Sequence, residues 1–323
     1  MRIDVIANLK TLHVRQNFAI LAHMKSICLF LLFALLQTVV PAQKILTVNY
    51  TTDNQNRYIF SCTNKDYCPY VVSLDFPTLT NAQADHPLPY VVEVKPGTAK
   101  LITVSPIDNT KEIKLNFKTA NRKGVLNPVV NLHFVYLLPI TPGIETQAYR
   151  VVNTKGSNTP GAQDTGYSVR LRAKPGDTIY AARCGVVTAV DVSNTENDAG
   201  ANATNGWNYI EIYHADNSFA QYGIVQKDGA FVQPGQTVEA GTPIGLVGGD
   251  RYGRGAEVRF SVSYYPGVPN TNIPLIFWTK DNGKGPLRHG ANYISEFPRA
   301  ILNQEGPKGK TPAKKPAHAG SHV

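Results

Sequence analysis

The chain has 323 residues, of which 42% are hydrophobic and 17% charged, an ordinary composition for a folded protein that is long enough for two domains. Its 32 basic and 23 acidic residues give a formal net charge of +9, but no nucleic-acid-binding motif accompanies this excess. We therefore expect no nucleic-acid partner and only non-specific attraction to polyanions. Abundant Gly, Pro and Tyr favour strands and turns over helices.

The first predicted element is a secretory signal peptide in the stretch MKSICLFLLFALLQTVVPAQ, which begins at Met24. A lysine precedes an apolar run from Ile27 to Leu36, and a small-residue cleavage pattern ends at Ala42. The run is too short to span a bilayer comfortably, so we expect cleavage near Ala42 and an exported chain that does not span the membrane. Its destination would be the periplasm, the cell surface or the medium. Residues 1–42 are assigned to the leader, and the true start is expected at Met24.

Residues 43–140 predict a small antiparallel β-sandwich, because strand-sized runs alternate with Pro, Gly and Asn. His133, in the last run, is expected to be a strand histidine with a structural partner. Residues 141–166 are rich in Pro, Gly, Thr and Asn, and predict a linker with a long surface loop. The predicted strands cover 44–52, 57–62, 70–76, 90–98, 99–107, 113–120 and 131–139.

Three cysteines follow the leader, and export allows them to form disulfides. Cys62 and Cys68 are a candidate pair, because a bridge would close a short loop between two strands, although geometry can forbid it. Cys184 is expected to be unpaired and to pack as a small apolar side chain. The sequence contains no CxxC pair and no Cys/His cluster with metal-ligand spacing.

Strand-like runs resume in a second predicted domain, residues 167–300, which precedes a disordered basic tail at 301–323. A polar insertion at 193–206 separates two of these runs, as an extended hairpin loop would. The predicted strands cover 167–173, 178–192, 207–215, 218–225, 236–248 and 257–265.

Four segments of this domain carry a family resemblance. They are KPGDTIYAARCGVVTAV, NYIEIYHADNSFAQY, GAFVQPGQTVEAGTPIGLVGG and GRGAEVRFSV, in this order along the chain. Together they resemble the lysostaphin-type (LytM-like) zinc endopeptidases, which have a duplicated hybrid motif and cut peptide cross-links in bacterial peptidoglycan. With the signal peptide and the strand-rich first domain, the chain is similar to the two-domain secreted version seen in Bacteroidetes-type bacteria. The resemblance implies an all-β protein, with an N-terminal antiparallel β-sandwich followed by an open antiparallel β-sheet domain.

The positions that hold zinc and transfer protons in that family carry other residues here. The family uses a tetrahedral zinc with three protein ligands and a water, assisted by further histidines. By the resemblance, the early aspartate corresponds to Arg170, and the tyrosine strand keeps Tyr222 but has Ile224 in place of histidine. The final HxH has become Glu257 and Arg259, and the early histidine has no candidate. A guanidinium cannot deprotonate to bind zinc. We therefore expect no metal, no cofactor and no catalytic residues.

Two interpretations of the substituted site remain open. In the first, Arg170 and Arg259 pair with Glu257 and replace a metal cross-link by ion pairs. In the second, these arginines and Arg172 form an anion-binding surface in the groove that loops frame in this family's fold, suited to stem-peptide carboxylates. Tyr222 is the tyrosine expected to line that groove, and Tyr180 and Trp207 are further aromatic candidates.

The resemblance implies an exported, catalytically inactive peptidase-fold protein that binds peptidoglycan or a protein of the cell envelope. One alternative is an active zinc-dependent peptidoglycan endopeptidase, which requires the correspondence above to be wrong at four positions; separately, Glu257, Asp164 and His214 could recruit zinc in an unexpected arrangement. Only under this alternative is zinc expected. Another alternative is a structural component of the envelope without a bound ligand.

Overall fold

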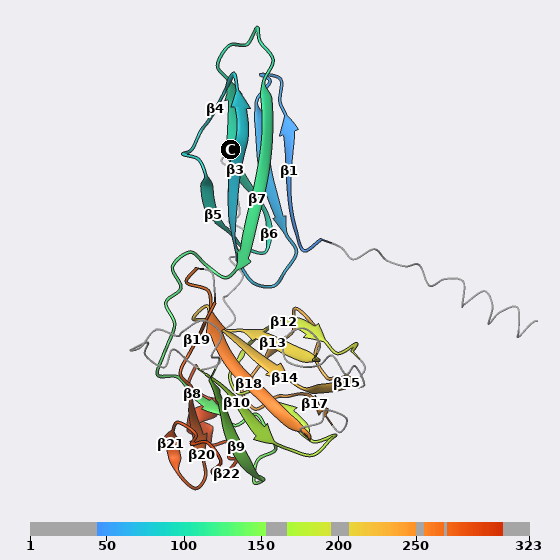
Figure 1. The fold of residues 1–323 in the computed structure, drawn as a ribbon, viewed down its shortest axis with the longest axis vertical. Helices are drawn as coiled ribbons and strands as arrows, with labels where there is room; N and C mark the ends of the chain where they lie inside the picture. Colours follow the sequence, from blue (N-terminus) through green and yellow to red (C-terminus); the bar gives the residue numbers. More distant parts are fainter. Residues whose placement is uncertain (1–43, 153–166, 195–206, 250–254, 268–269, 306–323) are drawn as a thin grey trace, which may run out of the picture. The chain divides into compact units, whose positions relative to one another are not determined.

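We analysed a computed structural model of the chain (Figure 1). The residues that it describes are 44–152, 167–194, 207–249, 255–267 and 270–305. The predicted signal peptide and the lysines of the basic tail lie outside these residues, as do Asp164 and most of the 193–206 insertion. The described residues from Ile45 onward belong to one compact unit.

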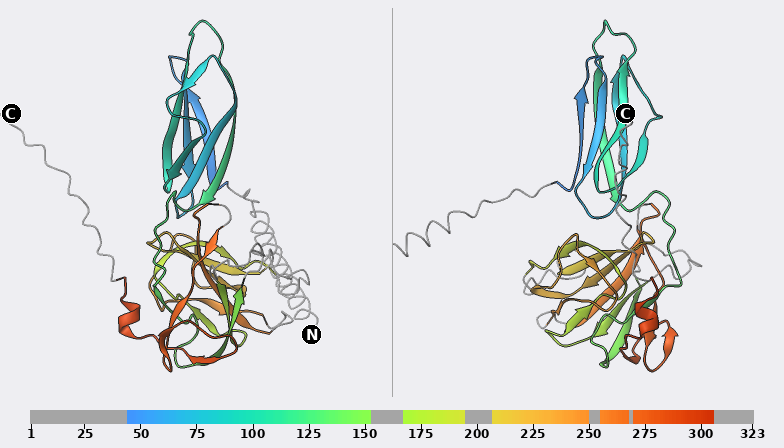
Figure 2. Two further views of the ribbon diagram at one scale, coloured as in Figure 1. Left: turned by 60° about the vertical axis from the view of Figure 1, so that its left-hand side comes forward. Right: turned by 180° about the vertical axis from the view of Figure 1, so that it is seen from behind.

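The N-terminal region is a sandwich of two antiparallel sheets, as expected from its alternating sequence (Figures 1 and 2). One sheet has the strand order β1-β2-β6-β4 and the other β5-β3-β7. In β2, Phe60, Cys62 and Asn64 point inward because side chains alternate between the two faces of a strand. The strands are β1 (Leu46–Thr52), β2 (Tyr58–Asn64), β3 (Tyr70–Thr80), β4 (Ala82–Ala84), β5 (Tyr90–Val94), β6 (Gly97–Pro106) and β7 (Lys114–Lys123).

The candidate disulfide of this sandwich is absent from the structure. Cys62 and Cys68 are both free and buried in the sandwich core. The loop between them is closed instead by Asn64, whose Nδ2 donates to the carbonyl oxygens of Cys68 and Val94, each at 3.0 Å. A side-chain amide therefore satisfies the buried backbone groups at this turn, and no covalent bond is needed to hold it.

The C-terminal region is built around a large, open antiparallel sheet with the order β16-β12-β13-β14-β18-β10-β9-β22, to which β19 adds at β18. Two three-stranded sheets, β11-β17-β15 and β21-β20-β8, complete it. The predicted all-β fold class is confirmed, since the only helix among the described residues is the short α2. The elements are β8 (Val135–Leu137), β9 (Glu145–Val152), β10 (Tyr167–Arg172), β11 (Thr178–Tyr180), β12 (Gly185–Asp191), β13 (Tyr209–Tyr213), β14 (Phe219–Gly223), β15 (Val225–Ala230), β16 (Thr237–Val238), β17 (Pro243–Val247), β18 (Glu257–Tyr264), β19 (Thr271–Asn272), β20 (Ile276–Thr279), β21 (Gly283–Gly285), β22 (Asn292–Ile294) and α2 (Arg299–Leu302).

Three stretches differ from the prediction. The stretch 141–166, predicted as linker and loop, contains β9, which pairs with β10 in the large sheet. The run 131–139 contributes only the short β8, which pairs in parallel with β20, and His133 lies in an exposed turn before it. Residues 301–305, predicted as part of a disordered tail, are described: they include the end of α2, and Glu305 contacts a buried arginine. In each case a pairing with a segment distant in sequence decides the conformation.

Two hydrophobic cores account for the stability of these sheets. One contains the inward residues of the sandwich, together with Phe219 from β14, and the other contains the inward residues of the C-terminal sheets. A largely buried ion pair joins Lys123 of β7 to Glu211 of β13, at 2.7 Å between Nζ and Oε1. No described helix has the length and apolar character needed to cross a membrane.

Candidate functional site

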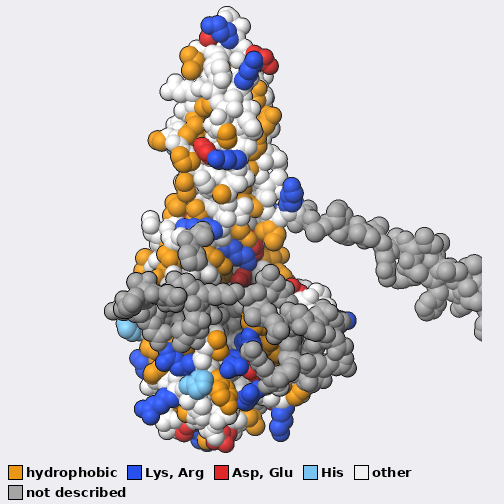
Figure 3. Space-filling view, in the orientation of Figure 1, with side chains coloured by type: hydrophobic (Ala, Val, Ile, Leu, Met, Phe, Trp, Pro, Cys, Tyr) orange, Lys and Arg blue, Asp and Glu red, His pale blue; other side chains and the backbone are white. Residues whose placement is uncertain are grey.

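The pairing of β10 with β18 brings four charged side chains onto one face of the large sheet. Arg170 lies directly opposite Arg259, and Arg172 lies directly opposite Glu257. Side chains opposite each other, or two residues apart on a strand, share a face. The alternate residues point into the core and hold the strands in register: Val169, Leu171, Val258 and Phe260 are all fully buried. Lys and Arg side chains are visible over the part of the molecule that carries β9, β10 and β18 (Figure 3).

Glu257 is a buried carboxylate surrounded by three guanidiniums. Its side chain is 2% exposed, and its Oε1 accepts a hydrogen bond of 2.8 Å from Nε of Arg259. The Nη1 atoms of Arg170 and Arg172 lie 3.9 and 3.8 Å from Oε2, close enough for ion pairs but too far for hydrogen bonds. These ion pairs are what the first interpretation of the substituted site predicts. They stabilise a charge whose burial without partners would be costly.

Aromatic rings lie against the same guanidiniums. The guanidinium carbon of Arg259 is 4.2 Å from the ring centre of Trp207. Those of Arg170 and Arg172 are 5.5 and 5.4 Å from the ring centre of Tyr149, which is directly opposite Arg170 on β9. All three distances are in the range of cation–π contacts. Tyr149 was not predicted as a site residue because it lies in the predicted linker, although the alternation in ETQAYRVV is a strand signal.

Two other aromatic candidates do not contribute to this face. Tyr222 is fully buried in the core, and its hydroxyl accepts a hydrogen bond of 2.8 Å from the backbone N–H of Ala182. Its predicted place in the lining of a groove is therefore wrong, because the Tyr222 ring packs in the core and does not face the surface. Tyr180 packs edge-on against Phe297, with ring centres 5.3 Å apart.

The residues that the resemblance assigns to the family's metal positions do not fit zinc. Ile224 offers a hydrocarbon and is 2% exposed, with φ of +67°, an unusual conformation for a β-branched residue. Arg170 and Arg259 offer cations, and Glu257 is already paired with them. The described residues include no group of three or more His, Cys, Asp or Glu side chains arranged to hold a metal. Catalytic zinc requires three such ligands, so the donor set here is that of an ion-pair cluster.

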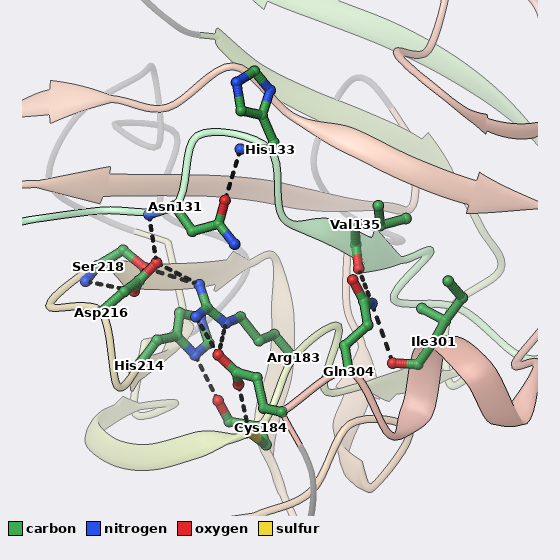
Figure 4. A network of polar contacts seen from close by, with 11 residues as sticks. Asn131, His133, Val135, Arg183, Cys184, His214, Asp216, Ser218, Ile301 and Gln304 are labelled. Carbon is green, nitrogen blue, oxygen red and sulfur yellow. Dashed lines mark hydrogen bonds and ion pairs between the residues drawn. The ribbon is translucent and has the colours of Figure 1, made fainter.

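A separate buried network surrounds Arg183, in the loop between β11 and β12 (Figure 4). The Arg183 side chain is 2% exposed and stacks on Phe134, with its guanidinium carbon 3.9 Å from the ring centre. Its Nη1 donates to Asp216 at 2.9 Å, and its Nε donates to Glu305 at 3.0 Å. Burial alone would raise the pKa of Glu305, but hydrogen bonds from Arg183 and Cys184 hold it below its ordinary value. The C-terminal segment is therefore joined to the domain by a charged hydrogen bond.

His214 is part of this network and is fully buried. Its Nδ1 lies 2.7 Å from the carbonyl oxygen of Cys184, which can only accept, so Nδ1 carries a proton (Figure 4). Burial, and next the charge of Arg183, lower the pKa of His214 to about 4, so the ring is neutral near pH 7. Nε2 is buried without a hydrogen-bond partner among the described residues. The proposed zinc site of Glu257, Asp164 and His214 thus lacks support: Glu257 and His214 are committed to different networks, and Asp164 is outside the described residues.

Comparisons with known proteins identify the family whose model matches the C-terminal region. Residues 165–270 match the model of Peptidase family M23. Among solved structures, a chain of the SpoIIQ-SpoIIIAH pore forming complex is 17% identical, with coverage of 43% of this chain and 89% of that one and a TM-score of 0.31. The catalytic domain of the prophage-encoded M23 protein EnpA from Enterococcus faecalis is 22% identical, with coverage of 46% and 93% and a TM-score of 0.25. A zinc-containing peptidase from Vibrio cholerae is 15% identical, with coverage of 68% and 75% and a TM-score of 0.24.

No curated protein matches this chain. The family model, by contrast, spans the strands from β10 to β18 and therefore all four charged residues of the candidate site. Residues 165–270 form a domain of peptidase family M23.

Proposed function

We propose that this chain is an exported binding protein with an M23 peptidase fold, that it does not hydrolyse peptides, and that its ligand is peptidoglycan or a protein of the cell envelope. The observation that carries this proposal is the buried Glu257, held by Arg259 at 2.8 Å with Arg170 and Arg172 at ion-pair distance. Arg170, Glu257 and Arg259 stand where the family resemblance places metal ligands and proton-transfer groups.

The chemistry of the site supports the loss of hydrolysis. Metal-assisted hydrolysis needs a cation that lowers the pKa of a bound water, and a base that can take its proton. The guanidiniums of Arg170 and Arg259 are hydrogen-bond donors and offer neither a metal ligand nor a proton acceptor. His214, a buried histidine of this domain, is neutral, but its protonated Nδ1 faces a backbone carbonyl and its Nε2 is enclosed. Neither group is suited to activate water for attack on a peptide.

The choice of ligand rests on the family and on charge. The resemblance of this domain to peptidoglycan endopeptidases implies a surface suited to the peptides of the cell wall. Those peptides carry carboxylates, and guanidiniums bind carboxylates through paired, charge-assisted hydrogen bonds. The expected signal peptide ending near Ala42 supports export to the same compartment.

The test combines metal analysis, hydrolysis and sedimentation. Purified protein is assayed for zinc, incubated with peptidoglycan beside an active M23 peptidase, and then sedimented with insoluble peptidoglycan. We expect substoichiometric zinc, no released peptides, and co-sedimentation that weakens when salt is added. Stoichiometric zinc with chelator-sensitive cleavage would instead establish the active peptidase. Absence of both cleavage and ligand binding, in a chain that is itself recovered in the envelope fraction, would favour a structural component.

A further inference from the structure

The charges at the centre of this face do not cancel. Arg170 and Arg259 are directly opposite each other on neighbouring strands, and one carboxylate, that of Glu257, lies beside them. Among the described residues, three guanidiniums, those of Arg170, Arg172 and Arg259, lie near this one carboxylate, so positive charge exceeds negative charge. Like charges directly opposite in a sheet repel, so an anion that binds between Arg170 and Arg259 would relieve their repulsion.

Both guanidiniums have hydrogen-bond donors to spare. Arg259 donates to Glu257 through Nε, and no described residue accepts from its two terminal nitrogens. Arg170 makes no guanidinium hydrogen bond to the described residues: its Nε has no partner, and its Nη1 is 3.9 Å from Glu257. Nε of Arg170 is buried, but each of the two arginine side chains is 20% exposed, so part of each side chain is accessible to a ligand.

Flat aromatic rings lie against the two arginines. Tyr149, Arg170 and Arg259 are direct cross-strand neighbours on β9, β10 and β18. The indole of Trp207 lies over the guanidinium of Arg259, with 4.2 Å between the ring centre and the guanidinium carbon. A stacked guanidinium is held flat, and less entropy is lost when its fork binds a planar partner.

We propose that Arg170 and Arg259 form a clamp for one carboxylate of a ligand, such as the C-terminal carboxylate of a peptide. This clamp specifies the chemical group that the proposed binding function recognises, and it rests on that proposed function for the source of the peptide. A carboxylate is favoured over a tetrahedral anion because its two coplanar oxygens match guanidinium forks. Glu257 shows that a carboxylate is accommodated beside these arginines, with one hydrogen bond from Arg259 and Arg170 at 3.9 Å. Trp207 acts as a positioning residue through Arg259.

The probe is acetyl-alanyl-alanine, titrated into the purified chain by NMR or calorimetry beside the same dipeptide with a C-terminal amide. We expect the acid to bind and the amide to bind at least about tenfold more weakly, a difference of about 1.4 kcal/mol. Arg259→Lys keeps the charge but removes the fork, and Arg170→Gln removes the charge. Both should weaken binding of the acid about tenfold or more. Lys227→Gln, which removes a half-exposed cation of β15, should change affinity less than twofold.

The comparison of acid and amide on the unaltered chain needs no variant and is therefore independent of folding. The clamp is wrong if the two dipeptides bind equally, or if inorganic phosphate competes as well as the acid does. It is also wrong if the Arg259→Lys chain melts like the unaltered chain and still binds the acid normally. Sedimentation with peptidoglycan separates the two proposals. A chain that sediments but does not prefer the acid retains the binding function without the clamp. A chain that binds the acid through Arg170 and Arg259 but does not sediment retains the clamp, and its peptide has another source.

Discussion

Glu305 joins the C-terminal segment to the M23 domain, and its removal should destabilise the fold. Arg183 is 2% exposed and is paired with two carboxylates, Asp216 at 2.9 Å and Glu305. Glu305→Ala deletes one of them and also the acceptor of the Cys184 thiol, whose Sγ lies 2.7 Å from Oε2. Because Arg183 cannot reach bulk water in its buried position, part of its positive charge is then uncompensated.

The size of the effect follows from burial. Breaking a buried ion pair by removing one partner costs about 3–5 kcal/mol. Glu305 is 20% exposed and Asp216 remains, so we expect the lower end, about 3 kcal/mol. Glu305→Gln keeps the shape and one acceptor but loses the charge, and should cost about 1.5 kcal/mol. For a unit of this size each kcal/mol shifts Tm by about 2–4 °C, so Glu305→Ala should lower Tm by about 6–12 °C.

Thermal melts followed by circular dichroism and urea titrations measure this loss, with Glu145→Ala as the matched control. Glu145 is an exposed acid of β9, and its removal should change stability by less than about 0.5 kcal/mol. The difference between the unaltered chain and Glu305→Ala should also depend on pH. The folded pKa of Glu305 is lowered, so its contribution is complete above about pH 4.3 and is lost as the pH falls through the folded value. A Glu305→Ala chain that melts within about 2 °C of the unaltered chain at pH 7 would refute this reasoning.

Three further outcomes are expected. Burial and Arg183 lower the pKa of His214 to about 4, while an unfolded histidine titrates near 6.5. The free energy of unfolding should therefore decrease by about 3 kcal/mol as the pH falls from about 6.5 to about 4, and urea titrations of His214→Gln should not show this decrease. Gly185→Ala should destabilise the chain by about 2 kcal/mol or more and lower its urea midpoint, because the new Cβ would lie 2.4 Å from the carbonyl oxygen of Tyr213; an unchanged midpoint would show that β12 shifts to accept it. N-terminal sequencing of protein from the medium or envelope should begin near Gln43, whereas a retained Met1 would contradict export.

Several features of the fold were predictable because they depend on local sequence. Alternation of polar and apolar residues predicted most of the strands, and the order of the four family segments predicted the M23 sheet. The same spacing identified Arg170, Glu257 and Arg259 as the residues at the substituted metal positions. The short strand β8 and the strand β9 were assigned wrongly. Their boundaries depend on pairing with β20 and β10, and Pro, Gly and Thr around 139–147 suggested a loop.

The sequence by itself determined which chemical groups this domain has: guanidiniums, a carboxylate and a hydrocarbon occupy the positions that the resemblance assigns to the family's metal site. Only the tertiary structure decided how they are arranged. Register between distant strands places Tyr149 beside Arg170, and Arg170 beside Arg259, and core packing turns Tyr222 away from the surface. The contact of Glu305 with a buried arginine likewise crosses more than a hundred residues of chain. Burial and cross-strand neighbours are properties of non-local pairing, which no local pattern in the sequence contains.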